Sequence, residues 1–468
     1  MQLSHTLPVV SATFDDPNLV SAAGLVPLMT LAEEAGLHAL GDEHLSLPTD
    51  KGANAGAKLA ALVAGMAAGA DSIEDMGLLR HGAMGKLFER PYAPSTLGSF
   101  LRTFTFGHVR QGDAVASRFT LALAGRTGLL GRAGDTGTVL LDLDDTIVEV
   151  HGYAKQGAGF GYSGVRGLNA LLATVSTEQT APVIAAQRLR KGSVGSSRGA
   201  ARLATDALAL VRRSHLAGRP VLLRADSAFY SAALVGAADR AGAQVSITVR
   251  LDPAVKRAIA AIAEDAWTTI RYTDAIYDQA TGRWVSRAEV AEIDYTAFTS
   301  AKKSEQVTGR LVVRRVPDLN PRAKDGQESM FDTWRFHAFF TTTPATERDT
   351  VAADQVHRGH AVIENVHADL KASALAHLPS GKFAANAAWL IAAVMAFNLT
   401  RAAATLTGST RLARATTPTI RRKLVNLPAR VASSARRLHL HLPRDWPWEH
   451  AWTVLYDALR PGRAAAPA

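Results

Sequence analysis

The spacing of apolar residues changes along the chain and predicts the elements that it forms. After an extended start, residues 1–130 carry apolar side chains at helical spacing, as at Leu25, Leu28 and Leu31. The following segment has runs of apolar and β-branched residues that predict strands at 138–149, 167–177, 181–189 and 220–226. Helical spacing predicts helices at 199–216 and 231–241, with Ser227 as a candidate cap for the second. This alternation indicates an α/β sheet with ligands at the carboxyl ends of its parallel strands.

Two later segments have patterns of their own. Residues 267–343 return to strand-like runs separated by polar breaks, and they predict a β-rich insertion. Residues 383–399 are apolar except for Asn386 and Asn398. This stretch of about 17 residues is short for a membrane span, which needs roughly 20, so we expect a buried core helix and no membrane partner.

The composition is that of a globular chain with an anionic partner. The 468 residues are 47% hydrophobic and 20% charged, which allows a large core divided among several domains. A formal net charge of +10 favours a polyanion such as nucleic acid. The tail from Arg401 onward has twelve Lys or Arg against three acids, which suggests contact with a polyanion, although a solvated basic surface has the same composition.

Cysteine is absent, which excludes disulfides, thiolate zinc sites and cysteine nucleophiles. The N-terminus has neither a basic region nor a long apolar region of the kind that directs export. A cytoplasmic location is therefore expected.

The segment 357–371, HRGHAVIENVHADLK, contains the highest density of candidate catalytic and metal-binding residues. Helical spacing places five polar residues on one face: His357, His360, Glu364, His367 and Lys371. Ile363, Val366 and Leu370 take the opposite, apolar side. One acid in a row of bases is a candidate metal ligand with an anion beside it, while a solvated helix face is the simpler alternative.

Two further carboxylates complete a candidate site. Asp144 lies in the first predicted strand, and Asp226 ends a later one. Two carboxylates on adjacent strands and Glu364 on a facing helix can hold two divalent ions, which activate an attacking oxygen and stabilise the leaving one in phosphodiester chemistry. Oxygen ligands favour Mg²⁺ or Mn²⁺.

On these residues the sequence resembles the DDE transposases of bacterial insertion sequences, in the group with a β-rich insertion before the catalytic Glu. The Asp144-Asp145-Thr146 stretch matches the family's Asp-x-Thr strand, and LLRAD ending at Asp226 matches its second motif. Glu364 and Lys371 match the signature Tyr-x2-Arg-x3-Glu-x6-Lys, whereas His357 replaces the Tyr and His360 the Arg. The resemblance covers residues 138–400, with a similar ending at 397–402.

The resemblance implies metal-dependent cut-and-paste transposition at the ends of the protein's own insertion sequence. Asp144, Asp226 and Glu364 would bind the metal ions, two in number by that analogy. His357, His360 and Lys371 would hold the DNA phosphate. Transposon ends and target are double-stranded DNA, and the pairing of two ends implies a homodimer on DNA in the bacterial cytoplasm, associated with the nucleoid.

The implied fold is α/β, a ribonuclease H-like core interrupted by a β-rich insertion, with a helical N-terminal domain. The expected domains are 1–130, helical, for DNA binding or assembly; 131–265, first part of the core; 266–345, insertion; 346–405, second part of the core with the catalytic helix; and 406–468, the basic C-terminal region. Some relatives stack a flipped base on an aromatic residue of the insertion. Trp284 and Trp334 are candidates, with a core position as the alternative for each.

Three alternatives stay open from the sequence. Asp142 and Asp145 are possible substitutes for Asp144, because three acids in four positions leave the register ambiguous. LLDLDDTI also resembles the first motif of haloacid-dehalogenase-type phosphatases, with Asp142 as nucleophile and Asp144 as acid or base, since both share one strand face. The third alternative is a catalytically inactive DNA-binding relative.

Overall fold

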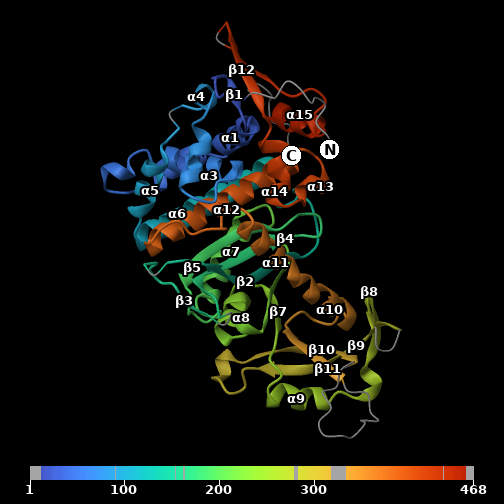
Figure 1. Ribbon diagram of the computed structural model, residues 1–468. Coiled ribbons are helices and arrows are strands. Elements are labelled where there is room, and N and C mark those ends of the chain that lie inside the picture. Colours follow the sequence, from blue (N-terminus) through green and yellow to red (C-terminus); the bar gives the residue numbers. More distant parts are fainter. Residues whose placement is uncertain are drawn as a thin grey trace.

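The computed structural model describes residues 12–89, 91–152, 154–161, 164–278, 283–317, 334–435 and 437–459, and for 271–278, 283–287 and 317 it describes the backbone alone. Helices from both ends of the chain gather at one end of the molecule, and long antiparallel strands occupy the other (Figure 1). A mixed sheet joins the two ends. The fold is therefore mixed α/β, as predicted.

The N-terminal region is helical, as its apolar spacing predicted. Its helices are α1 (Leu25–Glu34), α2 (Leu37–His44), α3 (Ala55–Ala68), α4 (Met84–Leu87), α5 (Pro94–Arg102) and α6 (Phe106–Thr127). Thr105 begins α6 with a reciprocal cap, in which His108 bonds back to the backbone of Thr105. The buried faces of these helices join one hydrophobic core with the sheet.

The central sheet has five strands in the order β5-β4-β2-β6-β7. Strand β4 runs antiparallel to both β2 and β5, whereas β6 runs parallel to β2 and β7 parallel to β6. The strands are β2 (Val139–Glu149), β4 (Arg166–Ser176), β5 (Val183–Lys191), β6 (Val221–Ala225) and β7 (Gln244–Thr248), with short β3 (Gly159–Phe160) beside β4. Helix α7 (Ala200–Arg213) leads from β5 to β6, and α8 (Ala232–Arg240) connects the parallel strands β6 and β7.

The predicted strands between β7 and the candidate catalytic helix are present, and they extend the same sheet. They are β8 (Thr268–Asp278), β9 (Arg283–Ala297), β10 (Val307–Pro317) and β11 (Trp334–Thr341), preceded by α9 (Pro253–Ala260). Strand β11 pairs antiparallel with β7, as at Phe339 and Thr248. The sheet is thus continuous from β5 to β8.

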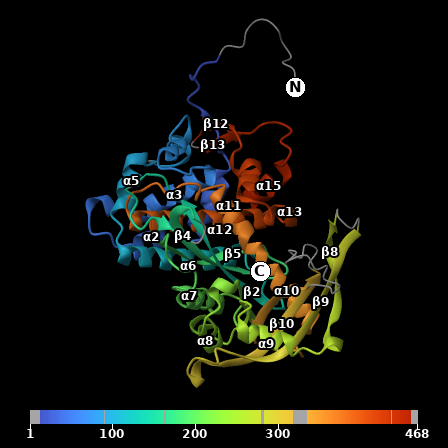
Figure 2. The ribbon, with the colours of Figure 1, turned by 60° about the horizontal axis from the view of Figure 1, so that its bottom comes forward.

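Helix α12 (Phe383–Leu406) is the central core helix. It is long and apolar enough to cross a membrane, and within the described residues it is the one helix that meets both conditions, but 89% of its apolar window is buried in the protein. It packs against α3, α6 and β5 (Figure 2). The prediction of a buried core helix is confirmed.

The remaining C-terminal elements return to the N-terminal helices. They are α10 (Thr350–Arg358), α11 (Val362–Lys371), α13 (Thr410–Ala413), α14 (Thr417–Ile420), a π-helical turn (Arg421–Val425), β12 (Ala429–Ser434), β13 (Arg437–His441) and α15 (Glu449–Ala458). Strand β1 (Leu19–Val20) pairs with β12, so the first and last parts of the described chain share a small sheet. Gly24 allows close packing there, because a Cβ would meet the carbonyl oxygen of Leu424 at 1.7 Å.

Candidate active site

Strand β2 presents its three acids on opposite faces, because side chains alternate along a strand. Asp142 and Asp144 face the segment 359–371, whereas Asp145 points to the other face. The Asp142 side chain is fully buried and that of Asp145 is 3% exposed, while Asp144 keeps 21% of its side chain exposed. Among the three, Asp144 is the acid that a substrate can reach.

Asp145 belongs to a buried polar network. Its carboxylate accepts hydrogen bonds from Arg190, Asn169 and Ser196, which lie beyond the opposite face of β2. The Arg190 guanidinium is also bound by the Asn169 side chain and by two backbone carbonyls. A carboxylate with all these partners has a structural role.

Asp226 lies beside Asp144 because β6 runs parallel to β2 with Ala225 opposite Leu143. Asp144 and Asp226 are thus the residues that directly follow the last paired residues of β2 and β6, and β2 continues to Glu149. Asp226 itself caps the turn that follows, accepting from the backbone N–H of Ala228 at 2.9 Å, and Ser231 caps α8. The expectation that Ser227 caps α8 was wrong, because a 3-10 turn at Ser227–Phe229 separates the strand from the helix.

The environment of these two carboxylates disfavours negative charge. Burial raises the pKa of Asp144 to about 7; the charge of Asp226 adds to this rise, and the backbone N–H of Asp145 and the positive charge of His360 oppose it. Burial also raises the pKa of Asp226. Two carboxylates that are costly to ionise side by side are stabilised by a bound cation.

The segment 357–371 is not one straight helix. Helix α10 ends at Arg358, a 3-10 turn covers Gly359–Ala361, and α11 begins at Val362. The predicted apolar side is confirmed, since Ile363, Val366 and Leu370 are buried. The change of pitch, however, separates His357 from the other polar residues that the spacing placed on its face.

His357 is half-buried and packs against β7 and β11. Its Nδ1 and Nε2 lie 2.9 and 3.0 Å from the hydroxyls of Ser246 and Thr248 on β7, and its ring stacks on Phe339 at 4.0 Å. Both ring nitrogens therefore have partners within the fold. This argues against the predicted role of His357 in holding a DNA phosphate.

His360 lies close to the carboxylates. Its Nδ1 is 3.1 Å from Oδ1 of Asp142, and its positive charge acts on the pKa of both Asp144 and Asp226. The sequence indicated His360 from helical spacing, but nothing in the sequence identified Asp142 as its partner.

His367 and Lys371 approach Asp144 from the next turns of α11. His367 Nε2 lies 3.5 Å from Oδ2 of Asp144. Burial lowers the pKa of His367 to about 4, and the charge of Lys371 lowers it further, so its imidazole is neutral near pH 7. Burial lowers the pKa of Lys371, against the opposing effect of Asp144. His367 and Lys371 therefore share one face of α11, as their spacing predicted, and this face lies beside β2.

Glu364 and Asp226 are exposed, whereas Asp144 is half-buried. It lies on the first turn of α11, one turn from both His360 and His367. Across the described residues, no three His, Cys, Asp or Glu side chains are grouped closely enough to hold a metal ion together. The structure therefore brings Asp144 and Asp226 together and leaves Glu364 outside that pair.

The phosphatase alternative meets a steric obstacle. Asp142 would have to be the nucleophile, yet it is fully buried and binds Arg224 through two hydrogen bonds of 2.7 and 2.8 Å. A carboxylate nucleophile must reach the phosphorus atom of its substrate. Asp142 has no such access.

Trp284 and Trp334, the two candidates for stacking a flipped base, both lie in the β-rich segment. Trp284 lies outside the residues whose side chains are described. Trp334 is half-buried, and the Arg315 guanidinium lies 4.6 Å from its ring centre and 4.2 Å from that of Trp267. These contacts give Trp334 a packing role within the sheet.

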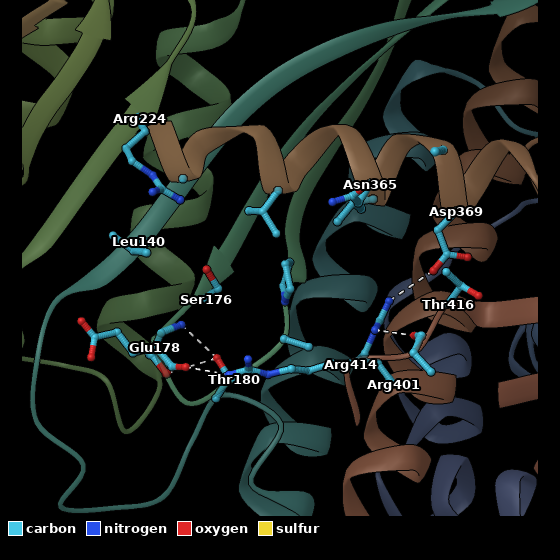
Figure 3. A pocket seen from close by; sticks show the side chains of 18 of the residues that line it. Leu140, Ser176, Glu178, Thr180, Arg224, Asn365, Asp369, Arg401, Arg414 and Thr416 are labelled. Atoms are coloured by element: carbon cyan, nitrogen blue, oxygen red, sulfur yellow. Dashed lines mark hydrogen bonds and ion pairs between the residues drawn. The ribbon is translucent and has the colours of Figure 1, made fainter. Parts of the chain in front are cut away.

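A separate cavity of about 650 Å³ runs along the other flank of α11 (Figure 3). Asn365 and Asp369 face it from the helix, Arg401 lies beside Asp369, and Arg414 reaches across to the carbonyl of Glu178. Arg401, the first of the tail cations, is tied to Asp369 at 3.2 Å and is buried. The proposed carboxylates do not line this cavity.

Comparison with known proteins identifies the family of the chain. No curated protein matches the sequence. A solved structure of piggyBac transposase, in a synaptic complex with hairpin DNA, covers 86% of this chain and 81% of its own, at 9% identity and a TM-score of 0.39, which is too low to support an argument. The model of the family described as Transposase DDE domain group 1 matches residues 4–464, almost the whole length. The chain therefore belongs to this family of DDE transposases.

Proposed function

We propose that the protein is a transposase that cleaves DNA at the ends of its own insertion sequence and joins the freed ends to a target. The observation that carries the proposal is the pair Asp144 and Asp226, which follow the last paired residues of the neighbouring strands β2 and β6, each with its pKa raised by burial. Family membership supports the same reading. The substrate would be double-stranded DNA, bound in the cytoplasm of a bacterium by a homodimer that pairs two ends.

The core is proposed to be ribonuclease H-like. Three antiparallel strands beside two parallel ones, in the order β5-β4-β2-β6-β7, support this assignment. The long strands β8–β11 between β7 and α10 support the proposed β-rich insertion.

The donor set fits a hard divalent cation. Asp144 and Asp226 offer carboxylate oxygens, which Mg²⁺ and Mn²⁺ prefer, and a cation would relieve the repulsion between them. Glu364 is proposed as the third ligand. Bound ions would supply charge stabilisation for the attacking and leaving oxygens.

The other residues of α11 would position the DNA. Lys371 can place a positive charge on a phosphate beside Asp144, and His360 can contact the same group from the opposite end of the site. Buried His367 fills the space behind Asp144 and keeps water from that side of the carboxylate.

The test is Mg²⁺- or Mn²⁺-dependent excision of a marked DNA flanked by the native neighbouring sequences of the gene. We expect the unmodified protein to excise it and Glu364→Gln to lose at least about 100-fold in rate, because the loss of a metal ligand outweighs typical second-shell losses. Glu305→Gln, an exposed acid in the β-rich segment, is the matched control and should cut normally.

Each other result has a clear meaning. Normal cutting by Glu364→Gln would remove this residue from the site. DNA binding without cutting by the unmodified protein would favour an inactive relative, and hydrolysis of p-nitrophenyl phosphate instead of DNA would favour the phosphatase.

A further inference from the structure

The buried carboxylate of Asp142 joins three parts of the fold. Its oxygens accept from Nε and Nη2 of Arg224 on β6, and Oδ1 lies 3.1 Å from Nδ1 of His360 in the 3-10 turn. Its side chain has no exposed surface. A buried charge of this kind is stable only when its partners are fixed and complete.

Arg224 is fixed as firmly as Asp142. Its Nη1 donates to the carbonyl of Val356 in the last turn of α10 at 2.5 Å. The chain then passes Arg224 at Gly359, where a Cβ would lie 2.8 Å from Nη1. The turn that carries His360 is therefore held against β2 and β6 at a set position.

The hydrogen-bonding chemistry determines how His360 is oriented. Arg224 only donates hydrogen bonds, so the oxygens of Asp142 are acceptors, and the ring nitrogen that faces Asp142 must carry a proton. That nitrogen is Nδ1. Nε2 has no protein partner within the described residues, and the ring lies near both Asp144 and Asp226.

We propose that Asp142 is a positioning residue, which holds the His360 ring by Nδ1 and thereby turns Nε2 toward the phosphodiester bound beside Asp144 and Asp226, where the imidazolium form donates Nε2–H to a phosphate oxygen. The proposal rests on the proposed function for the identity of that ligand. Arg224 completes the arrangement by keeping Asp142 in place. A histidine held by a buried carboxylate thus occupies the position where the resembled signature has an arginine.

The first measurement needs no altered Asp142. The ¹⁵N shifts of selectively labelled histidines report which ring nitrogen is protonated, and the His360 signal is identified by its loss in His360→Gln. We expect Nδ1 of His360 to be protonated in the unmodified full-length protein. An unprotonated Nδ1 would overturn the proposal, whatever the activity.

The second measurement uses Asp142→Asn. Oδ1 of Asp142 faces both Nε of Arg224 and Nδ1 of His360, and Oδ2 faces Nη2 of Arg224. In either orientation the amide N–H₂ of the variant therefore meets an N–H of Arg224, and the buried negative charge beside His360 is lost. We expect the His360 ring to lose its fixed orientation, so that its ¹⁵N signals shift, and the cleavage rate at saturating DNA to fall between about 10- and 10⁴-fold, by analogy with the loss of a histidine-orienting aspartate. The DNA concentration for half-maximal rate should not change.

Two controls separate positioning from general damage. Asp145→Asn alters an equally buried, arginine-paired acid on the other face of β2, and in the folded protein it should leave the His360 signal unchanged. In a His360→Arg background Asp142→Asn should cost less, because a guanidinium donates from every nitrogen. An equal cost in both backgrounds would overturn the proposal.

The experiments distinguish a failure of the proposed active site from a failure of the proposed role of Asp142. If Glu364→Gln cuts normally, the proposed active site is wrong, but the protonation of Nδ1 still tests the Asp142 contact. If Glu364→Gln is inactive while Asp142→Asn cuts normally, the active site stands and the positioning role is wrong.

Discussion

His357 is neutral in the folded protein, because burial lowers the pKa of its imidazole to about 3 and the nearby charges of His360 and Arg224 lower it further. In the unfolded chain the pKa is about 6.5. Between these values the unfolded chain binds a proton that the folded chain does not, so stability is lost as the pH falls from about 6.5 toward 3.

Replacement of His357 should remove this part of the pH dependence. We expect His357→Gln to lose about 1–3 kcal/mol at pH 7, because it loses its stacking and its two hydroxyl contacts, and to show a shallower fall in stability below pH 6.5. Urea unfolding at a series of pH values measures both. DNA cleavage at pH 7 should change little, and a loss as large as that of Glu364→Gln would restore the phosphate-binding role.

Asp145 is expected to matter for stability and not for chemistry. Asp145→Asn leaves the buried Arg190 charge without its carboxylate, which typically costs about 3–5 kcal/mol. The urea midpoint should fall accordingly, while the fraction that remains folded should still cut DNA. If cutting is abolished without any loss of stability, the acid register that favours Asp144 is wrong.

At the scale of elements, Asn398 ties helix α12 to its neighbours. Its side chain bonds both the N–H and the carbonyl of Ile184 on β5, and it reaches the hydroxyl of Thr120 on α6 at 3.0 Å. These bonds satisfy the backbone of Ile184 at an irregular point of the β4–β5 pairing.

Asn398→Leu should therefore destabilise the protein although it makes the helix more apolar. Each buried group left without a partner costs about 1–3 kcal/mol, so we expect a loss of at least about 2 kcal/mol by urea unfolding. Thr400→Val is the matched control, because the Thr400 hydroxyl bonds only within its own helix. An equal loss in both variants would show that the contact between elements adds nothing.

At the scale of the whole molecule, positive charge is concentrated in the later part of the chain. Residues 370–444 contain no Asp or Glu. Some of the cations there are internal, as Arg401 shows, but Arg411 and Arg422 are exposed. The charge available to a polyanion is therefore smaller than the sequence count.

This distribution predicts how DNA binding depends on salt. Each Lys or Arg that contacts a phosphate contributes about −0.9 to the slope of log affinity against log salt. If Arg411 and Arg422 both contact DNA, Arg411→Gln with Arg422→Gln should make the slope shallower by about 2. Arg212→Gln with Arg213→Gln on α7 removes the same net charge and should leave the slope unchanged; equal slopes in both pairs would place the contact elsewhere.

The sequence by itself determined the elements and their order. Helical spacing in residues 1–130, the strand runs around Asp144 and Asp226, and the apolar stretch of α12 all depend on local periodicity, which a sequence records directly. The same periodicity identified His367 and Lys371 on one face of α11. It also placed Asp144 within a strand and Asp226 directly after one, and neighbouring parallel strands bring such positions close together.

Tertiary structure decided which of these residues has a partner. Asp142, Asp144 and Asp145 look equivalent in the sequence, and only the packing of Arg224 and Arg190 against opposite faces of β2 distinguishes them. His357 left the predicted face because a 3-10 turn at Gly359 changed the pitch. These differences arise from contacts between residues that lie 45 to 218 positions apart, and no local spacing contains them.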